Sequence, residues 1–345
     1  MSNGIRLFKV LGIRISIDRT WFIVFVLIAW SLSFGYFPLH LPGLGKLTYV
    51  IMGVVSSLIL FMCVLAHELS HSYVSNRLGL EIRGITLFIF GGVAELSKEP
   101  EDPKTELKIA VAGPMASAGL ALIFYAASIA SASFNAPTLT AVTSYLAMIN
   151  IMLVIFNMIP GFPLDGGRVL RALWWMKTKD MTGATRAASM VGKGFAVFLI
   201  LSGLLQITRG GFIGGIWSIF IGLFLRQAAE SSYQQVIMKT SLDGVKVSEI
   251  MSKNVITITT DLSVASVVEN YFLSYHYASF PVVKEGAVKG ILTLKGVKEL
   301  QRDDWNKTSV QSIMEELTSD DVLEPDDSAL TALKKLTTSK IGRCV

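Results

Sequence analysis

The segment VLAHELSHSY, residues 64 to 73, places two histidines and a glutamate at the end of an apolar run. His67 and His71 are four residues apart, so on a helix their Cβ atoms share one face about 5–6 Å apart, which suits two imidazoles on one metal ion. Glu68 stands beside them, as in the His-Glu-x-x-His pattern, where the glutamate is the general base that activates water. The spacing therefore predicts metal-assisted hydrolysis.

A structural alternative is that both histidines are core residues, hydrogen-bonded to neighbouring helices. The apolar surroundings argue against it, because ionisable groups inside a membrane-spanning segment are costly and usually functional. We therefore favour the metal site.

Two histidines do not complete a catalytic zinc site, which takes three protein ligands and keeps one position open. The other histidines are poor candidates, because His40 falls in a predicted external loop and His276 in the polar C-terminal part. Asp165 is a better one, since Pro160 and Pro163 should break or kink the preceding helix near its end. An Asp-Gly-Gly sequence is also a common turn, but its expected depth in the membrane matches that of the two histidines.

Composition indicates an integral membrane protein with a soluble tail. Of 345 residues, 52% are hydrophobic and 17% are charged, against about 25% charged in ordinary soluble domains. Mean hydropathy is +0.54. The apolar residues concentrate before the last hundred, which are rich in Lys, Glu and Asp, and two cysteines make no disulfide framework.

We expect a polytopic α-helical membrane protein with six spans, each near the ~20 residues that a bilayer requires. The spans are Trp21–Tyr36, Leu47–Tyr73, Leu107–Ala132, Leu139–Ile159, Met190–Ile207 and Phe212–Leu225. Before the first span, GIRLFKVLGIRISID alternates apolar and polar residues, which predicts a strand and not a signal peptide.

Lysines and arginines gather in alternate loops, which predicts a cell-membrane protein with both termini in the cytoplasm. The opposite loops hold only Lys46 and Arg209. The net charge of +5 thus reflects orientation, and no nucleic-acid partner is expected.

Between the second and third spans, Thr86–Phe90 is rich in β-forming residues, and Gly91-Gly92 interrupts it. We expect a strand or hairpin near the cytoplasmic face. Unpaired backbone groups cannot face lipid, so this strand must pair within the protein or accept a guest strand.

The polar tail contains a tandem repeat with a period of about sixty residues. Its first copy has VSEIM at 247–251, and the second has VQSIM at 310–314. The second copy stops at Val345, before equivalents of FPVVKEG and GILTL, so we expect either an incomplete second unit or a truncated chain.

HELSH in one span and NMIPGFPLDGG in a later one resemble the site-2 protease family of intramembrane zinc metalloproteases. AVAGPMAS at 110–117 resembles the Gly-Pro stretch of that family's third helix, and ITLFIFGGVAEL its membrane-proximal sheet. The resemblance implies one zinc ion held by His67, His71 and Asp165. It also implies Glu68 as base, Asn157 as an assisting residue, and transmembrane protein substrates.

The tail resembles a pair of cystathionine β-synthase (CBS) domains, which implies a soluble α/β tail that can pair with that of a second chain in a homodimer. We expect a membrane-embedded protease domain over residues 1–240, CBS units at 241–302 and 306–345, and regulation by the tail. Adenine nucleotides bind such pairs through Gly-x-x-Thr-x-x-Asp. Gly290 and Thr293 fit, but Gly296 replaces the aspartate, which argues against a nucleotide here.

Two other functions fit parts of the pattern. A polytopic zinc protease that processes prenylated proteins uses a glutamate as third ligand, and none is as well placed as Asp165. A transporter or channel gated by the CBS pair would place His67 and Asp165 in an ion path. Bound zinc, with proteolysis lost in Glu68→Gln, separates an enzyme from a transporter.

Overall fold

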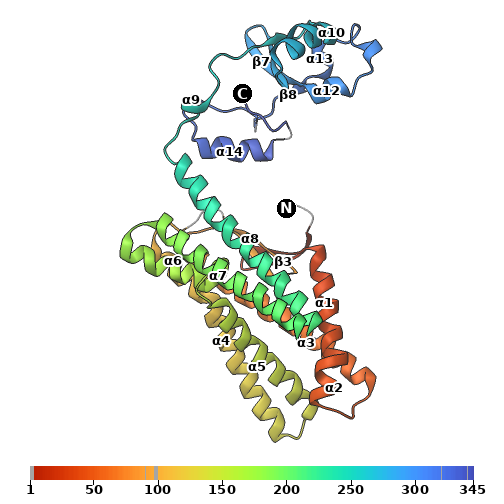
Figure 1. Cartoon of the computed structure of the whole chain (residues 1–345), viewed down its shortest axis with the longest axis vertical. Helices are drawn as coiled ribbons and strands as arrows, with labels where there is room; N and C mark the ends of the chain where they lie inside the picture. Colours follow the sequence, from red (N-terminus) through yellow and green to blue (C-terminus); the bar gives the residue numbers. More distant parts are fainter. Residues whose placement is uncertain (1–3, 90, 97–99, 320, 340) are drawn as a thin grey trace. The chain divides into compact units, whose positions relative to one another are not determined.

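Figure 1 shows the computed structural model, which describes residues 4–89, 91–96, 100–319, 321–339 and 341–345. The chain divides into two compact units, Met1–Val236 and Ile237–Val345. Each unit has its own four-stranded sheet. The first holds the residues expected to do chemistry.

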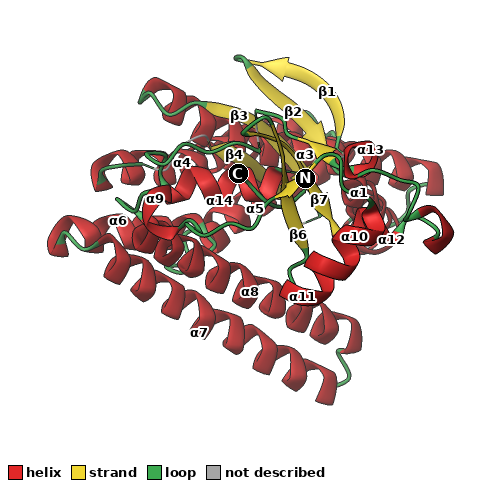
Figure 2. Ribbon diagram, turned by 90° about the horizontal axis from the view of Figure 1, so that it is seen from above, coloured by secondary structure: helices red, strands yellow, loops and turns green. Residues whose placement is uncertain are grey.

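Six helices among the described residues are long and apolar enough to cross a membrane, which confirms the expected fold class. The first span, Arg19–His40, combines α1 (Arg19–Ser31), a π-helical turn (Leu32–Tyr36) and α2 (Phe37–His40). The others are α3 (Lys46–Arg77), α4 (Pro103–Ser133), α5 (Pro137–Asn157), α7 (Met181–Thr208) and α8 (Phe212–Leu242). Figure 1 shows α4 beside α5, and Figure 2 shows α7 beside α8.

The helices extend beyond the apolar runs that predicted them. The fifth begins at Met181 instead of Met190, because Asp180 caps it by accepting a hydrogen bond from the backbone N–H of Gly183. The sixth continues past Leu225 to Leu242, with a polar extension that hydropathy does not detect.

Helix α6 (Asp165–Thr178) was not predicted. It lies between α5 and α7 in sequence, where the prolines and glycines indicated only a turn. The turn exists at residues 158–164, but Asp165 is the first residue of the helix that follows. Gly166 and Gly167 occupy its first turn. A Cβ on Gly166 would overlap the carbonyl oxygens of Met158 and Ile159, so only glycine permits this close packing.

The sheet of the first unit contains β1 (Ile5–Val10), β2 (Ile13–Ile17), β3 (Ile82–Phe88) and β4 (Gly91–Leu96), in that order. Strands β1 and β2 form the expected N-terminal hairpin, β2 pairs parallel with β3, and β3 pairs antiparallel with β4. The predicted strand at Thr86–Phe90 thus starts earlier, at Ile82. Phe90 itself lies outside the described residues.

This sheet packs against α1 and α3 through alternate residues of β2 and β3. The shared core contains Ile13, Ile15, Ile17, Ile85 and Leu87 from the strands, with Trp21, Val24 and Phe61 from the helices. Since both edges of β3 are paired, that strand cannot accept a guest as envisaged from sequence. Among the described strands of this sheet, β4 and β1 form the edges (Figure 2).

The second unit is a small α/β fold. Its sheet runs in the order β5 (Ile258–Thr259), β6 (Ser279–Lys284), β7 (Ala287–Thr293) and β8 (Glu315–Glu316). Its short helices are α9 (Val247–Ile250), α10 (Val264–Val267), α11 (Leu273–Tyr275), α12 (Leu294–Lys298), α13 (Val310–Ile313) and α14 (Ala329–Thr338), with a π-helical turn at Val268–Phe272 and a 3₁₀ turn at Arg302–Asp304.

The two sequence repeats of this unit exchange backbone hydrogen bonds. Val247 N–H donates to Asp327 at 2.9 Å, and Ala329 N–H returns a bond to Val245 at 2.8 Å. The equivalent exchange joins the start of the second repeat to the middle of the first. Val310 N–H donates to Leu262 at 2.9 Å, and Val264 N–H to Thr308 at 3.0 Å. The two repeats therefore pair with each other through reciprocal backbone hydrogen bonds.

Candidate metal centre

Three predicted ligands converge where α3 meets the first turn of α6. The Oδ2 atom of Asp165 lies 3.1 Å from Nε2 of His67 and 3.2 Å from Nε2 of His71. The two Nε2 atoms are 3.2 Å apart. Around a tetrahedral zinc with bonds of about 2.0–2.2 Å, neighbouring ligand atoms lie roughly 3.3–3.5 Å from each other. The observed triangle is slightly smaller than this and is close to the size that such an ion requires.

The hydrogen bond of His71 determines which of its ring nitrogens can bind a cation at the centre of this triangle. Its Nδ1 atom lies 2.7 Å from the backbone carbonyl of Ile109, which can only accept, so Nδ1 carries the proton. In the neutral ring, Nε2 then points a lone pair toward the Asp165 carboxylate. A single proton could bridge only one pair of these atoms, whereas a metal ion binds all three. The donor set thus fits zinc.

Helix α4 orients both imidazoles through contacts that the local sequence pattern did not reveal. Ser117 Oγ lies 2.9 Å from Nδ1 of His67, and the carbonyl of Ile109 holds His71. Such outer hydrogen bonds fix the tautomer and ring orientation of a metal ligand. AVAGPMAS suggested a family, but the partners of the histidines became visible only in the packing of α4 against α3.

Gly113 of α4 leaves the space in which these ligand atoms meet. A Cβ at this position would overlap Nε2 of His71 and would lie 2.5 Å from Nε2 of His67. The absence of a side chain is therefore a condition for the site. This residue completes a buried face of α4 with Ile109 and Ser117, four residues to either side.

Glu68 is half-buried beside the ligands and packs on the start of strand β4. A Cβ on Gly92 would lie 2.5 Å from Cγ of Glu68, so the backbone of β4 packs directly on this side chain. No hydrogen bond to the carboxylate occurs within the described part of the chain. Asn157, the last residue of α5, is also half-buried and likewise without a side-chain hydrogen bond there. The functional roles of Glu68 and Asn157 are therefore proposals.

Sequence comparison identifies the family to which this chain belongs. The model of peptidase family M50 matches residues 55–136 and 128–201, which include every candidate ligand. Rip3 of Mycobacterium tuberculosis is 30% identical over 338 residues, covering 97% of this chain and 86% of that protein. The chain belongs to peptidase family M50.

A protein sequence and a solved structure from Methanocaldococcus jannaschii are also similar to this M50 peptidase. The zinc metalloprotease MJ0392 is 32% identical over 316 residues, covering 90% of this chain and 85% of that protein. A solved site-2 protease from the same organism is 33% identical and covers 67% of this chain and 95% of its own, with a TM-score of 0.45. Membership confirms the expectation of a metalloprotease.

The tail of the M50 peptidase matches the CBS domain model over residues 247–303. Thr293, which fitted the nucleotide pattern, caps α12 by accepting a hydrogen bond from Gly296 N–H at 3.1 Å. Its hydroxyl also lies 3.4 Å from Oε1 of Glu315 in the second repeat. Thr293 therefore has a structural role in the described unit.

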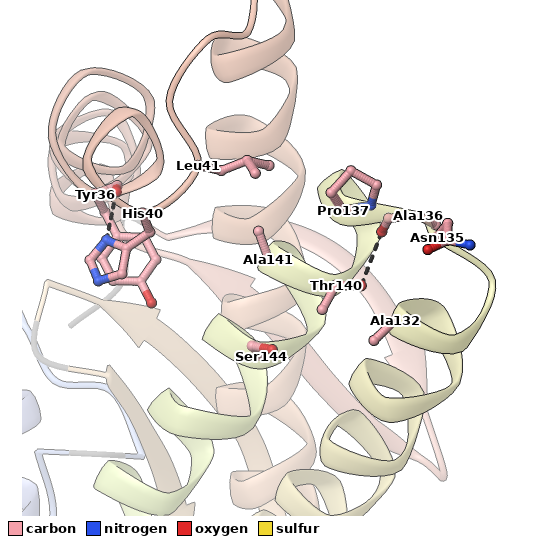
Figure 3. A pocket seen from close by; sticks show the side chains of 10 residues that line it. All are labelled: Tyr36, His40, Leu41, Ala132, Asn135, Ala136, Pro137, Thr140, Ala141 and Ser144. Carbon is pink, nitrogen blue, oxygen red and sulfur yellow. Dashed lines mark hydrogen bonds between the residues drawn. The ribbon is translucent and has the colours of Figure 1, made fainter.

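His40, which sequence analysis set aside as a ligand, is the last residue of α2 and lines a separate cavity of 580 Å³ (Figure 3). Its ring stacks on Tyr36 with centroids 4.0 Å apart, and its Nδ1 atom lies 2.8 Å from the Tyr36 carbonyl. Asn135, in the turn between α4 and α5, and Thr140, in the first part of α5, line the other side. None of the metal-site residues lines this cavity.

Proposed function

We propose that this protein is an intramembrane zinc metalloprotease that hydrolyses peptide bonds within or near the transmembrane segments of membrane proteins. His67, His71 and Asp165 would hold one zinc ion per chain. The observation that carries the proposal is the triangle of ligand atoms, 3.1–3.2 Å on a side, built in part by a helix long enough to span a bilayer.

Zinc, when bound at such a site, acts as a Lewis acid that polarises the scissile carbonyl and makes water more acidic. The chain's own residues perform the proton transfer. Glu68 accepts a proton from the attacking water and later delivers it to the leaving amine. Asn157, at the end of α5, assists by orienting the substrate.

A transmembrane helix hides its carbonyl groups in its own hydrogen bonds, so the substrate must unwind before attack. Strand β4 offers an edge to hold the unwound segment by β-addition, since β3 is paired on both sides. The contact between Gly92 and Glu68 supports this choice, because a peptide beside β4 would run close to the proposed base.

Removing one ligand tests the metal site and the enzyme function together. Asp165→Asn should reduce bound zinc from about one ion per chain to near zero after dialysis, and cleavage of a transmembrane substrate should disappear. Zinc is measured by elemental analysis of the purified protein, with Asp243→Asn as the matched control at an exposed position. Full zinc occupancy in Asp165→Asn would refute the site, and zinc binding without proteolysis in the native chain would favour a transporter.

We propose that both termini lie in the cytoplasm, on the strength of the basic residues in alternate loops. Arg171, one of the arginines between the fourth and fifth spans, contributes little to this bias, since it is buried against Glu106 on α4. The remaining bias still favours this orientation. A reporter enzyme fused after Lys239 should be active in the cytoplasm, and one inserted between Ala132 and Leu139 should be active outside. The opposite pattern would invert the topology.

We also propose that the tail, with CBS units at 241–302 and 306–345, controls substrate access and performs no chemistry. A chain ending at Leu242 keeps α8 whole and removes both repeats. It should retain about one zinc per chain and cleave a short soluble peptide at a rate within about threefold of the full chain, while its rates on membrane substrates change by more. Loss of zinc on truncation would instead make the tail part of the catalytic fold. A homodimer through the CBS units would also be lost in this chain.

A further inference from the structure

A buried ion pair joins α4 to α6 close to the candidate metal site. Nε of Arg171 donates to Oε1 of Glu106 at 2.7 Å, and Nη2 of the same guanidinium contacts that oxygen. Glu106 has no exposed surface, and Arg171 is 6% exposed. Arg168 adds a second guanidinium, with its Nε 3.9 Å from Oε1 of Glu106.

Glu106 belongs to the face of α4 that orients the histidines. It precedes Ile109 by three residues and Gly113 by seven, and Ser117 continues the same face. The carbonyl of Ile109 holds His71, and the hydroxyl of Ser117 holds His67. Gly113 leaves room for both rings between them. The position of Glu106 is therefore rigidly related to that of the two imidazoles.

Arg171 belongs to the helix that brings the carboxylate ligand. It follows Asp165 by six residues, and Arg168 follows by three, so both lie within about two turns of the ligand. The guanidinium of Arg171 also lies over the ring of Phe162, at 5.0 Å from the centroid. Phe162 is buried in the turn just before Asp165. One side chain thus contacts α4 and the turn that sets the start of α6.

Stability alone does not explain this arrangement. Buried ion pairs can often be replaced by apolar residues of similar volume without loss of stability, because desolvation offsets their attraction. Oε2 of Glu106 is also buried without a hydrogen-bond partner among the described residues. The pair fixes the distance and direction between α4 and α6. Two nitrogens of one planar guanidinium contact the same carboxylate oxygen, and this two-point contact is more directional than apolar packing.

We propose that Glu106 and Arg171 are positioning residues that hold Asp165 at ligand distance from His67 and His71. The inference rests on the proposed role of Asp165 as a zinc ligand. It predicts that breaking the pair weakens metal binding even where the fold persists.

The decisive variant is Glu106→Leu/Arg171→Met, which removes both charges at similar volume. In the full-length protein in detergent, its metal-free form should unfold at a temperature close to that of the wild type. Its zinc dissociation constant, from competition with a chelator, should rise about 10–100-fold, as for other residues that orient metal ligands. The absorption spectrum of the cobalt-substituted protein should change, because one ligand has moved. Glu230→Gln, which breaks the partly exposed Lys193–Glu230 pair, is the matched control and should alter neither readout.

Zinc affinity within about twofold of the wild type and an unchanged cobalt spectrum would overturn the positioning role. If the double variant fails to fold, Arg171→Lys decides, since it keeps the charge but cannot make the two-point contact. Wild-type zinc affinity in a folded Arg171→Lys protein would equally overturn the proposal. Asp165→Asn, measured in parallel, separates the two hypotheses. If Asp165→Asn keeps its zinc, the proposed metal site is wrong. If Asp165→Asn loses zinc but the variants of Glu106 and Arg171 keep it, only the positioning role is refuted.

Discussion

Glu68→Gln is expected to reduce peptide-bond hydrolysis about 10³-fold while zinc content stays near one ion per chain. Glutamine has the shape and polarity of the native side chain, so its packing on Gly92 should persist. It cannot accept a proton at neutral pH, and general base catalysis by a positioned side chain contributes roughly 10²–10⁴-fold. The measurement is the cleavage rate of a reconstituted transmembrane substrate, together with zinc analysis of the same preparation.

Glu81→Gln is the matched control, because Glu81 is an exposed residue in the loop between α3 and β3. It should cleave at the rate of the native protein. A Glu68→Gln enzyme within about threefold of that rate would show that another group accepts the proton. Loss of zinc in Glu68→Gln would indicate that this side chain supports the metal site, and the assigned role would then need revision.

Gly113→Ala should abolish stoichiometric zinc binding through the addition of one methyl group. The new Cβ would occupy the space between the Nε2 atoms of His67 and His71. Neither ring can simply rotate away, because Ser117 and the Ile109 carbonyl hold their Nδ1 atoms. We expect zinc affinity to fall by more than the 10–100-fold that loss of an outer hydrogen bond typically causes, and cleavage to fall with it.

The control lies on the same helix. At Gly119, no atom of another described element lies within 4 Å of the position that a methyl group would take, so Gly119→Ala should leave zinc affinity unchanged and stabilise α4 slightly. Competition with a chelator measures the affinity, and thermal unfolding of the metal-free proteins reports their folding. Normal zinc binding by a folded Gly113→Ala protein would contradict the ligand geometry described above.

The sequence by itself determined the features that depend on neighbouring residues. The spacing of His67 and His71 places two imidazoles on one helix face, and the apolar runs predict six spans, because both follow from the period and length of a helix. The tandem repeat of the tail is likewise evident from the amino-acid sequence. Asp165 could be placed on the same side of the membrane as the histidines by counting spans, and the resemblance to a family then made it their partner as a ligand.

Tertiary structure decided how these parts meet. Gly113, Ser117 and Glu106 lie on a helix whose apolar composition marks it only as a span, and their roles arise from atoms of α3 and α6 that pack against it. Helix α6 escaped prediction because its first turn contains two glycines. Those glycines are needed for its contact with the preceding turn. Strand β3 became interior because β2, some 70 residues earlier in the chain, pairs beside it. Contacts between distant segments leave no local periodicity, so packing alone assigned these residues to the site.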